Sequence, residues 1–273
     1  MSSRIHPTAV IGKNVEIGDD VEIGPYTVIK DNVSIGARTI IESHVTLHSF
    51  LTLGEGNHVF PHADLGALPQ DIHFKDVETR LEIGNGNTIR EFVSIHRSKF
   101  AGQKTVIGND NFIMGYAHIA HDCRLGNNVI LANYAALSGH VEVEDRAFLS
   151  GFTGVHQFVR IGTMSLTGGV AKIAQDILPY TMVDGNPPGL YGLNRIGLKR
   201  NGVPPEVRDA MKQTVRIVMK VGNRQKIIEA LSVLEIARLP EIAHFIEFMK
   251  NSKRGFVMKR RGAPEETFDD QDE

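Results

Sequence analysis

Histidines in the middle of the chain are the residues best suited to acid-base chemistry. His118 and His121 flank Ile119, and Asp122 follows the second histidine directly. An imidazole changes its protonation state near pH 6.5, so it can accept a proton from a hydroxyl group at neutral pH. His121 could also be an exposed histidine without a catalytic role. Asp122 could either orient the imidazole or form a turn. The role of His121 as a general base therefore depends on what surrounds it.

Further histidines could contribute to the same site. His96 precedes this segment, while His140 and His156 follow it, and Gln157 comes directly after His156. These residues are far apart in the sequence. A common site requires a framework that stacks distant segments on one another.

A six-residue repeat predicts that framework. Every sixth residue from Ile5 to Ile173 is Ile, Leu or Val, except Asp71, Ala101 and Thr167. An amphipathic helix needs apolar residues three and four positions apart, and a single strand needs them two apart, so neither explains this period. Short strands joined by tight turns do, with a small or branched residue following four positions after each aliphatic. Because three such units close one coil of a triangular prism, the sequence predicts a parallel β-helix whose coils bury one another.

The repeat also predicts where the side chains around His121 point. Ile119 and Cys123 occupy inward positions, whereas His121 points outward on a face of the prism. Cys123 is the single cysteine, so it forms no internal disulfide, and its register predicts a buried, unreactive thiol. We therefore expect no covalent intermediate on Cys123.

Several segments depart from the repeat. Residues 66–80 and 97–105 are polar and are expected to be loops extruded from a β-helix of residues 1–186; loops on a rigid scaffold commonly carry function. Pro204-Pro205-Glu206 opens a predicted helix that runs to about Val221, and a second helix is expected from Arg224 to Ala237. Pro240 suits the first turn of a third helix that ends near Asn251, so we expect a small helical domain of residues 187–258. The acidic tail, 259–273, contains almost nothing apolar and is expected to be disordered.

Composition limits the class of protein. The 273 residues carry a formal net charge of -2, so no general basic field favours nucleic acid, and we expect none as a partner. The first residues contain no apolar core of a signal peptide, and no apolar run reaches the length of a membrane span. We expect a cytoplasmic protein without an integral membrane segment.

The repeat units resemble those of the hexapeptide-repeat acyltransferases, and the motifs between residues 5 and 257 resemble the UDP-N-acetylglucosamine acyltransferases of lipid A synthesis. The resemblance implies a left-handed β-helix, a homotrimer and transfer of a 3-hydroxyacyl chain to the sugar 3-position. The motifs that carry it are Gln70-Asp71, His118 with His121, Gly139-His140, His156-Gln157-Phe158, Gln175-Asp176, Pro179-Tyr180, Asp184-Gly185-Asn186 and Gly197-Leu198-Lys199-Arg200.

The resemblance also implies roles for individual residues. His121 is the expected general base, and the backbone amide of Gly151 the expected donor to the thioester oxyanion. Gly169 is expected to end the acyl groove and act as a ruler. The sugar-nucleotide cleft is expected between two subunits, lined by His118, His140, His156 and Gln157. Gln70 and Asp71 are expected to contact the sugar. Asn194 and Arg200 are expected to contact the uridine diphosphate.

The resemblance implies no bound cofactor and no metal. The acyl chain arrives on the phosphopantetheine of acyl carrier protein as a co-substrate. Arg208, Lys212, Arg216 and Lys220 recur every four residues and form a basic stripe on a predicted helix. Such a stripe is often only a solvated face, but here it could accelerate docking of the acidic carrier protein.

Three departures from the family pattern surround the sugar and its diphosphate. His73 stands where a lysine is frequent, Ile196 where some members have Glu, and Asn201 where a second arginine is frequent. A UDP-sugar with a 3-amino group, which would give an amide, is therefore an alternative acceptor.

Two other classes share the predicted fold. A trimeric zinc hydratase would need three histidines to converge at about 2.0–2.1 Å from the metal, whereas His118 and His121 lie on opposite sides of Ile119. A β-helix that serves only as a scaffold would have no use for His121, Gly151 and the loop residues.

Overall fold

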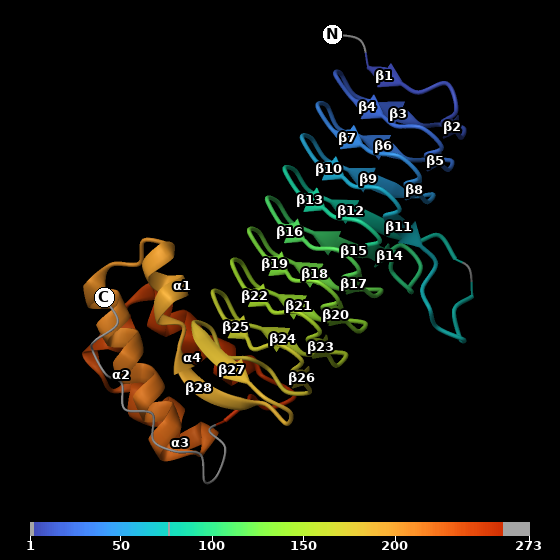
Figure 1. The fold of residues 1–273 in the computed structure, drawn as a ribbon. Helices are drawn as coiled ribbons and strands as arrows, with labels where there is room; N and C mark the ends of the chain where they lie inside the picture. Colours follow the sequence, from blue (N-terminus) through green and yellow to red (C-terminus); the bar gives the residue numbers. More distant parts are fainter. Residues whose placement is uncertain (1–2, 76, 259–273) are drawn as a thin grey trace.

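The computed structural model describes residues 3–75 and 77–258, and within them it confirms a left-handed parallel β-helix followed by a small helical unit. The coils form a straight column, with the helices packed at its C-terminal end (Figure 1). The predicted tail, 259–273, lies outside the described residues.

Three sheets form the faces of the prism, and each strand pairs with strands one coil away. The 11-stranded sheet contains β1 (Arg4–Ile5), β4 (Glu22–Ile23), β7 (Ile40–Ile41), β10 (His58–Val59), β13 (Thr88–Ile89), β16 (Phe112–Ile113), β19 (Ile130–Leu131), β22 (Phe148–Leu149), β25 (Leu166–Thr167), β27 (Thr181–Asp184) and β28 (Gly189–Leu193). The 9-stranded sheet contains β2 (Val10–Ile11), β5 (Val28–Ile29), β8 (Thr46–Leu47), β11 (Asp64–Ala67), β14 (Ser94–His96), β17 (His118–Ile119), β20 (Ala136–Leu137), β23 (Gly154–Val155) and β26 (Lys172–Ile173). The 8-stranded sheet contains β3 (Glu16–Ile17), β6 (Ser34–Ile35), β9 (Leu51–Leu53), β12 (Arg80–Ile83), β15 (Lys104–Ile107), β18 (Arg124–Leu125), β21 (Glu142–Val143) and β24 (Arg160–Ile161).

The repeat residues fill the core of the prism. Ile119, Leu137 and Val155, for example, are buried and lie in register in successive coils of the 9-stranded sheet. The chain turns each corner through a residue in the left-handed region, such as Asp122 and His140, both with φ of 62°. Asp and Asn tolerate this conformation better than other non-glycine residues.

Three inward positions hold asparagine. Asn57, Asn87 and Asn111 are buried, and each side-chain oxygen accepts the backbone N–H of the next coil. This ladder satisfies amide oxygens that would otherwise be costly to bury.

The two extruded loops leave the column side by side. The first lies between β11 and β12, and the second between β14 and β15 (Figure 1). Backbone N–H groups of Arg97, Ser98 and Gly102 in the second loop donate to carbonyl groups of Ala67, Arg80 and Glu78. The two loops are therefore tied together.

The C-terminal unit contains α1 (Arg195–Arg200), α2 (Pro205–Val221), α3 (Arg224–Ser232), a 3-10 helix (Glu235–Arg238) and α4 (Pro240–Asn251). Before it, β27 and β28 form an antiparallel hairpin that extends the 11-stranded sheet. The predicted boundary at residue 186 falls in the turn of this hairpin, and the pattern gave no signal for β28.

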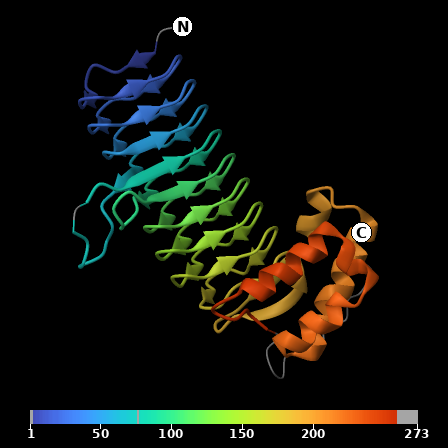
Figure 2. The same cartoon turned by 180° about the vertical axis from the view of Figure 1, so that it is seen from behind.

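Polar contacts join the helical unit to the last coils. The guanidinium of Arg160 lies 4.2 Å from the ring centre of Phe248, and the carboxylate of the buried Asp176 accepts a 2.7 Å hydrogen bond from the Ser252 hydroxyl. Figure 2 shows the helices from the other side, against the end of the column. No helix among the described residues is long and apolar enough to cross a membrane.

Candidate functional site

His121 lies on the edge of the prism between the 9-stranded and 8-stranded sheets, in the turn that joins β17 to β18. Its Nδ1 is 2.7 Å from Oδ2 of Asp122, and the side chains of His121 and Asp122 are 15% and 9% exposed. A hydrogen bond at Nδ1 fixes the ring and leaves Nε2 for a substrate. The structure thus pairs His121 with Asp122, as a positioned base requires.

The carboxylate of Asp122 is held from three further sides. The Ser98 hydroxyl donates to Oδ1, the Lys99 backbone N–H lies 3.3 Å from Oδ2, and Nε2 of His140 lies 3.7 Å from Oδ2. Burial alone would raise the pKa of Asp122, but the hydrogen bonds of His121 and Ser98 outweigh it and lower the pKa. Asp122 therefore remains an anion next to the base.

Gly139 is a site residue that the sequence interpretation did not assign. It occupies the position of His121 one coil later, and a Cβ atom there would lie 2.5 Å from Cε1 and 2.9 Å from Nε2 of the imidazole. Only glycine lets the backbone approach the ring this closely. The repeat register, which places 139 eighteen residues after 121, was the available signal.

The remaining predicted histidines follow the same face and edge. His118 Nδ1 is 2.8 Å from the Ser94 hydroxyl, and burial lowers the pKa of His118. His140 stacks on Phe158 with ring centres 4.5 Å apart. His156 and Gln157 are exposed one coil beyond. The column therefore brings His118, His121, His140, His156 and Gln157 to neighbouring coils of one surface.

His96 is buried beside this group. Its ring meets His118 edge to face at 5.0 Å, and desolvation, followed by the charge of His118, lowers the pKa of His96 to about 4. A neutral His96 at physiological pH follows from this environment.

The first extruded loop reaches the same region. Asp71 Oδ2 lies 2.5 Å from the Lys99 ammonium, and this hydrogen bond lowers the pKa of Asp71. Gln70 and His73 in the same loop are exposed. Through Lys99, Asp71 is therefore connected to Asp122, whereas His73 is solvent-facing.

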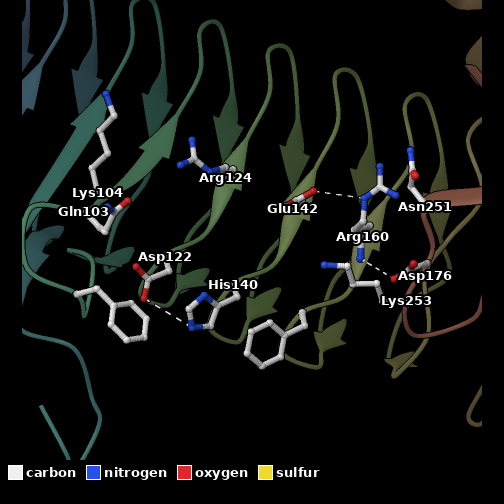
Figure 3. A pocket seen from close by; sticks show the side chains of 12 residues that line it. Gln103, Lys104, Asp122, Arg124, His140, Glu142, Arg160, Asp176, Asn251 and Lys253 are labelled. Atoms are coloured by element: carbon white, nitrogen blue, oxygen red, sulfur yellow. Dashed lines mark hydrogen bonds and ion pairs between the residues drawn. The ribbon is translucent and has the colours of Figure 1, made fainter. Parts of the chain in front are cut away.

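A groove of about 590 Å³ leads away from Asp122, next to His121, along the 8-stranded sheet. Lys104, Asp122 and Arg124 lie towards one end, and Arg160, Asn251 and Lys253 at the other, with His140 and Glu142 between them (Figure 3). Glu142 partly offsets these cations through a 3.3 Å ion pair with Arg160.

Gly151 and Gly169 lie on a different edge, between the 11-stranded and 9-stranded sheets, one coil apart. Within one chain the structure does not bring Gly151 to His121. An exposed ladder of rings runs along this edge, with successive ring centres 4.7–5.0 Å apart. It consists of Tyr26, His44, His62, Phe92, Tyr116, Tyr134 and Phe152.

The predicted nucleotide contacts surround α1, away from the extruded loops in Figures 1 and 2. Arg200 is exposed, but Asn194 caps α1: its Oδ1 accepts from the Gly197 N–H at 3.0 Å and its Nδ2 donates to Met164 at 2.8 Å. Of the departures near α1, Asn201 forms the C-cap of this helix, and Ile196 is 67% exposed.

The basic stripe on α2 is only partly accessible. Arg216 and Lys220 are exposed, whereas Arg208 and Lys212 are half-buried. Cys123 is fully buried, and desolvation raises the pKa of its thiol to about 12.

His121, Asp122 and His140 also present potential metal ligand atoms within 4.8 Å of one another. Asp122 is already engaged by His121 and Ser98, so a cation would have to compete with these hydrogen bonds.

Comparisons with known proteins identify the family of the chain. Residues 176–257 match the second-domain model of UDP-N-acetylglucosamine O-acyltransferases, and residues 2–31, 14–49 and 104–139 match the bacterial transferase hexapeptide model. The acyl-(acyl-carrier-protein)–UDP-N-acetylglucosamine O-acyltransferase of Thermodesulfovibrio yellowstonii is 45% identical over 93% of this chain and 98% of its own length. The corresponding Synechocystis enzyme is 43% identical, over 96% of this chain and 94% of its own.

Solved structures give the same result. The UDP-N-acetylglucosamine acyltransferase of Francisella novicida superimposes with a TM-score of 0.89 at 35% identity, covering 93% of this chain and 94% of that one. The Campylobacter jejuni enzyme superimposes with a TM-score of 0.88 at 36% identity, covering 94% and 100%.

Proposed function

The chain belongs to the family of acyl-(acyl-carrier-protein)–UDP-N-acetylglucosamine O-acyltransferases, and from this premise we propose that it transfers a 3-hydroxyacyl chain from acyl carrier protein to the 3-hydroxyl of UDP-N-acetylglucosamine, the first step of lipid A synthesis. The observation that carries the proposal is the imidazole of His121, fixed by Asp122 at Nδ1 and backed by Gly139.

The reaction uses His121 as a general base. Nε2 accepts the proton of the sugar 3-hydroxyl while the oxygen attacks the thioester carbonyl, so that a C–O bond forms in a tetrahedral intermediate. When the intermediate collapses, the C–S bond breaks and the proton passes from the imidazolium to the departing thiolate. The anionic Asp122 stabilises the imidazolium between these steps.

The intermediate carries an oxyanion that needs backbone donors. In one chain, Gly139 is the glycine that lies against the base. We place Gly151 in the same cleft only as a residue of a neighbouring subunit, because it lies on another edge of its own prism.

A homotrimer explains this distribution. The loop between β11 and β12, which contains Gln70 and Asp71, and the helix α1, which Asn194 caps and Arg200 ends, lie on opposite sides of the column (Figure 1). One sugar nucleotide would therefore contact them from two chains. The outward apolar side chains of the 11-stranded sheet, beside the exposed ring ladder, offer a surface for such contact and for an acyl chain. They include Phe112, Ile130, Phe148 and Leu166.

Acyl carrier protein supplies the acyl-phosphopantetheine in this proposal, and no cofactor is bound. Arg216 and Lys220, with Arg208 and Lys212 contributing less, form the basic surface for its approach. The cations of the groove suit the phosphate of a substrate arm. The proposed location is the cytoplasm, where an unpaired buried thiol such as Cys123 is ordinary.

The test is a product assay with purified protein, 3-hydroxyacyl carrier protein and UDP-N-acetylglucosamine, read by mass spectrometry. We expect an ester product, which mild alkali cleaves. The 3-amino analogue of the sugar serves as a parallel acceptor, and a much faster amide product from it would overturn the assignment of the acceptor. Metal content is measured on the same sample, and activity that is lost with a chelator and restored by zinc would contradict the metal-free mechanism.

A further inference from the structure

The second extruded loop contacts both halves of the site. Ser98 is fully buried and Lys99 is half-buried, and they are adjacent residues of this loop. Ser98 donates its hydroxyl proton to Oδ1 of Asp122, and the Lys99 backbone N–H donates to Oδ2. Both oxygens of the carboxylate that holds His121 are thus bound by the loop.

Lys99 also reaches the acceptor side. Its Nζ lies 2.5 Å from Oδ2 of Asp71, and the two side chains are only 25% and 20% exposed. An ion pair with this degree of shielding is less weakened by solvent than a surface pair. Lys99 therefore provides a cation close to Asp71 from the second loop.

We propose that Ser98 and Lys99 are positioning residues that link the acceptor loop to the catalytic base, so that the sugar held by Asp71 and the proton acceptor His121 are fixed relative to each other. This deepens the proposed function and rests on it. The connection runs from Asp71 through Lys99 to Asp122 and then to His121, with each step an observed contact.

Two features make this connection rigid. The backbone of the second loop is bonded to the first loop at Arg97, Ser98 and Gly102, so the loops move together. Hydrogen bonds to a buried carboxylate are charge-assisted and stronger than neutral ones. A displacement of Asp71 by the sugar is therefore transmitted to Asp122 rather than absorbed by solvent.

The proposal predicts different kinetic effects at the two residues. Ser98→Ala should lower kcat about tenfold, the usual effect of losing a hydrogen bond to a charged group, with little change in either KM. Lys99→Met should raise the KM for UDP-N-acetylglucosamine about tenfold, because Asp71 loses its anchor, and should also lower kcat, because the sugar is no longer fixed relative to His121. The KM for the acyl donor should not change.

Conservative variants and matched controls separate positioning from folding. Ser98→Thr keeps the hydroxyl and should restore kcat, and Lys99→Arg should restore most of the acceptor affinity. Ser34→Ala removes a hydroxyl 3.5 Å from the Glu16 carboxylate in a distant coil, and Arg38→Met removes a 2.5 Å surface ion pair with Glu55, also far from the loops. Both controls should behave as wild type.

A double-mutant cycle tests the connection itself. If Lys99 acts through Asp71, Lys99→Met combined with Asp71→Asn should be no worse than the poorer single variant. Wild-type turnover in the product assay establishes the proposed function independently. With an active wild type, unchanged kinetics in Ser98→Ala and Lys99→Met would overturn the coupling. So would losses that follow Tm alone and are not restored by Ser98→Thr.

Discussion

At the scale of residues, the site depends on one imidazole whose surroundings are unusually constrained. His121 is held at Nδ1 by Asp122, and its ring packs against Gly139 without room for a Cβ atom. Because none of its side chain contributes to the aliphatic core, its contribution to chemistry can be tested apart from stability.

His121→Ala should therefore abolish most turnover while folding and assembly persist. A positioned general base commonly contributes about a hundredfold to ten-thousandfold in rate. Steady-state kinetics measure the loss, and thermal unfolding with size-exclusion chromatography verify the fold. Retention of more than about a tenth of the wild-type rate would mean that another group is the base.

Cys123 tests whether the reaction passes through a covalent intermediate. It is adjacent in sequence to His121 and Asp122, yet its thiol is buried away from solvent. Burial raises the pKa of its thiol to about 12, and its Sγ donates to the Ser138 carbonyl at 3.2 Å. Native enzyme treated with iodoacetamide should keep its activity, and Cys123→Ala should turn over nearly normally. An acylated Cys123 in a trapped reaction would instead establish a covalent intermediate.

Residue types and register predicted which side chains share the surface around His121, because a strict period places positions eighteen residues apart in adjacent coils. The contacts of Ser98 and Lys99 were not predictable in the same way. They lie in a loop without the repeat, where no period relates sequence to space.

At the scale of elements, the turn that carries Gly139 is part of the site, because it determines how closely the next coil approaches the base. The position is buried, and its Cβ would meet the imidazole rather than backbone.

Gly139→Ala should displace the His121 ring and lower kcat by at least about tenfold, since small misplacements of a catalytic group are costly. Gly154→Ala is the matched control, because a Cβ at Gly154 meets nothing within 4 Å. The kinetics of the two variants should differ while both melt near the wild-type temperature. Equal activity would mean that the ring accommodates a methyl group.

The six-residue repeat predicted the strands of the β-helix correctly, but it did not predict the hairpin at the C-terminal end of the column. Aliphatic residues at inward positions specify strands, whereas β28 belongs to a hairpin whose pairing depends on β27 rather than on the repeat. The buried Asn57, Asn87 and Asn111 interrupt the expected inward pattern of small or branched residues, and only their stacking from coil to coil makes them acceptable.

At the scale of the whole molecule, the helical unit is attached to the column by charged contacts. His244 of α4 lies 2.8 Å from Glu144 in the turn that follows β21. This hydrogen bond raises the pKa of His244. The protonated, paired histidine therefore stabilises the fold fully below the unfolded pKa of about 6.5, and this contribution is lost as pH rises through the folded value.

His244→Gln should consequently lower the free energy of unfolding more at about pH 6 than at about pH 9, by at most about 1 kcal/mol, as is usual for a partly exposed pair. This should appear as a larger drop in Tm at the lower pH. His6→Gln, at an exposed histidine in the first coil, should show no such difference. Thermal unfolding at both pH values provides the measurement. An equal loss at both would show that the contact does not depend on protonation.

In the proposed trimer, the groove between columns is expected to select the length of the acyl chain, and Gly169 is the residue expected to lie at the end of that groove. This residue is exposed one coil beyond Gly151, next to the apolar face of the 11-stranded sheet. A Cβ at Gly169 would have only the Gly151 carbonyl nearby, at 3.5 Å, so a side chain fits without distorting the coil. In the proposed trimer the acyl chain runs along the groove between columns, and a glycine here leaves the groove open for a long chain.

Gly169→Met should close that groove and shift preference toward shorter 3-hydroxyacyl donors. Each methylene excluded from the groove loses about 0.8 kcal/mol of burial, so a difference of a few carbons changes selectivity by orders of magnitude. The measurement is a competition between long and short 3-hydroxyacyl carrier-protein thioesters, with Gly169→Ala as the graded control of intermediate effect. The short donor should react at close to the wild-type rate, because His121 and Asp122 lie on another edge of the prism than residue 169. If the preference of Gly169→Met equals that of wild type, the acyl chain does not pass this residue, and the groove must lie on another face of the column.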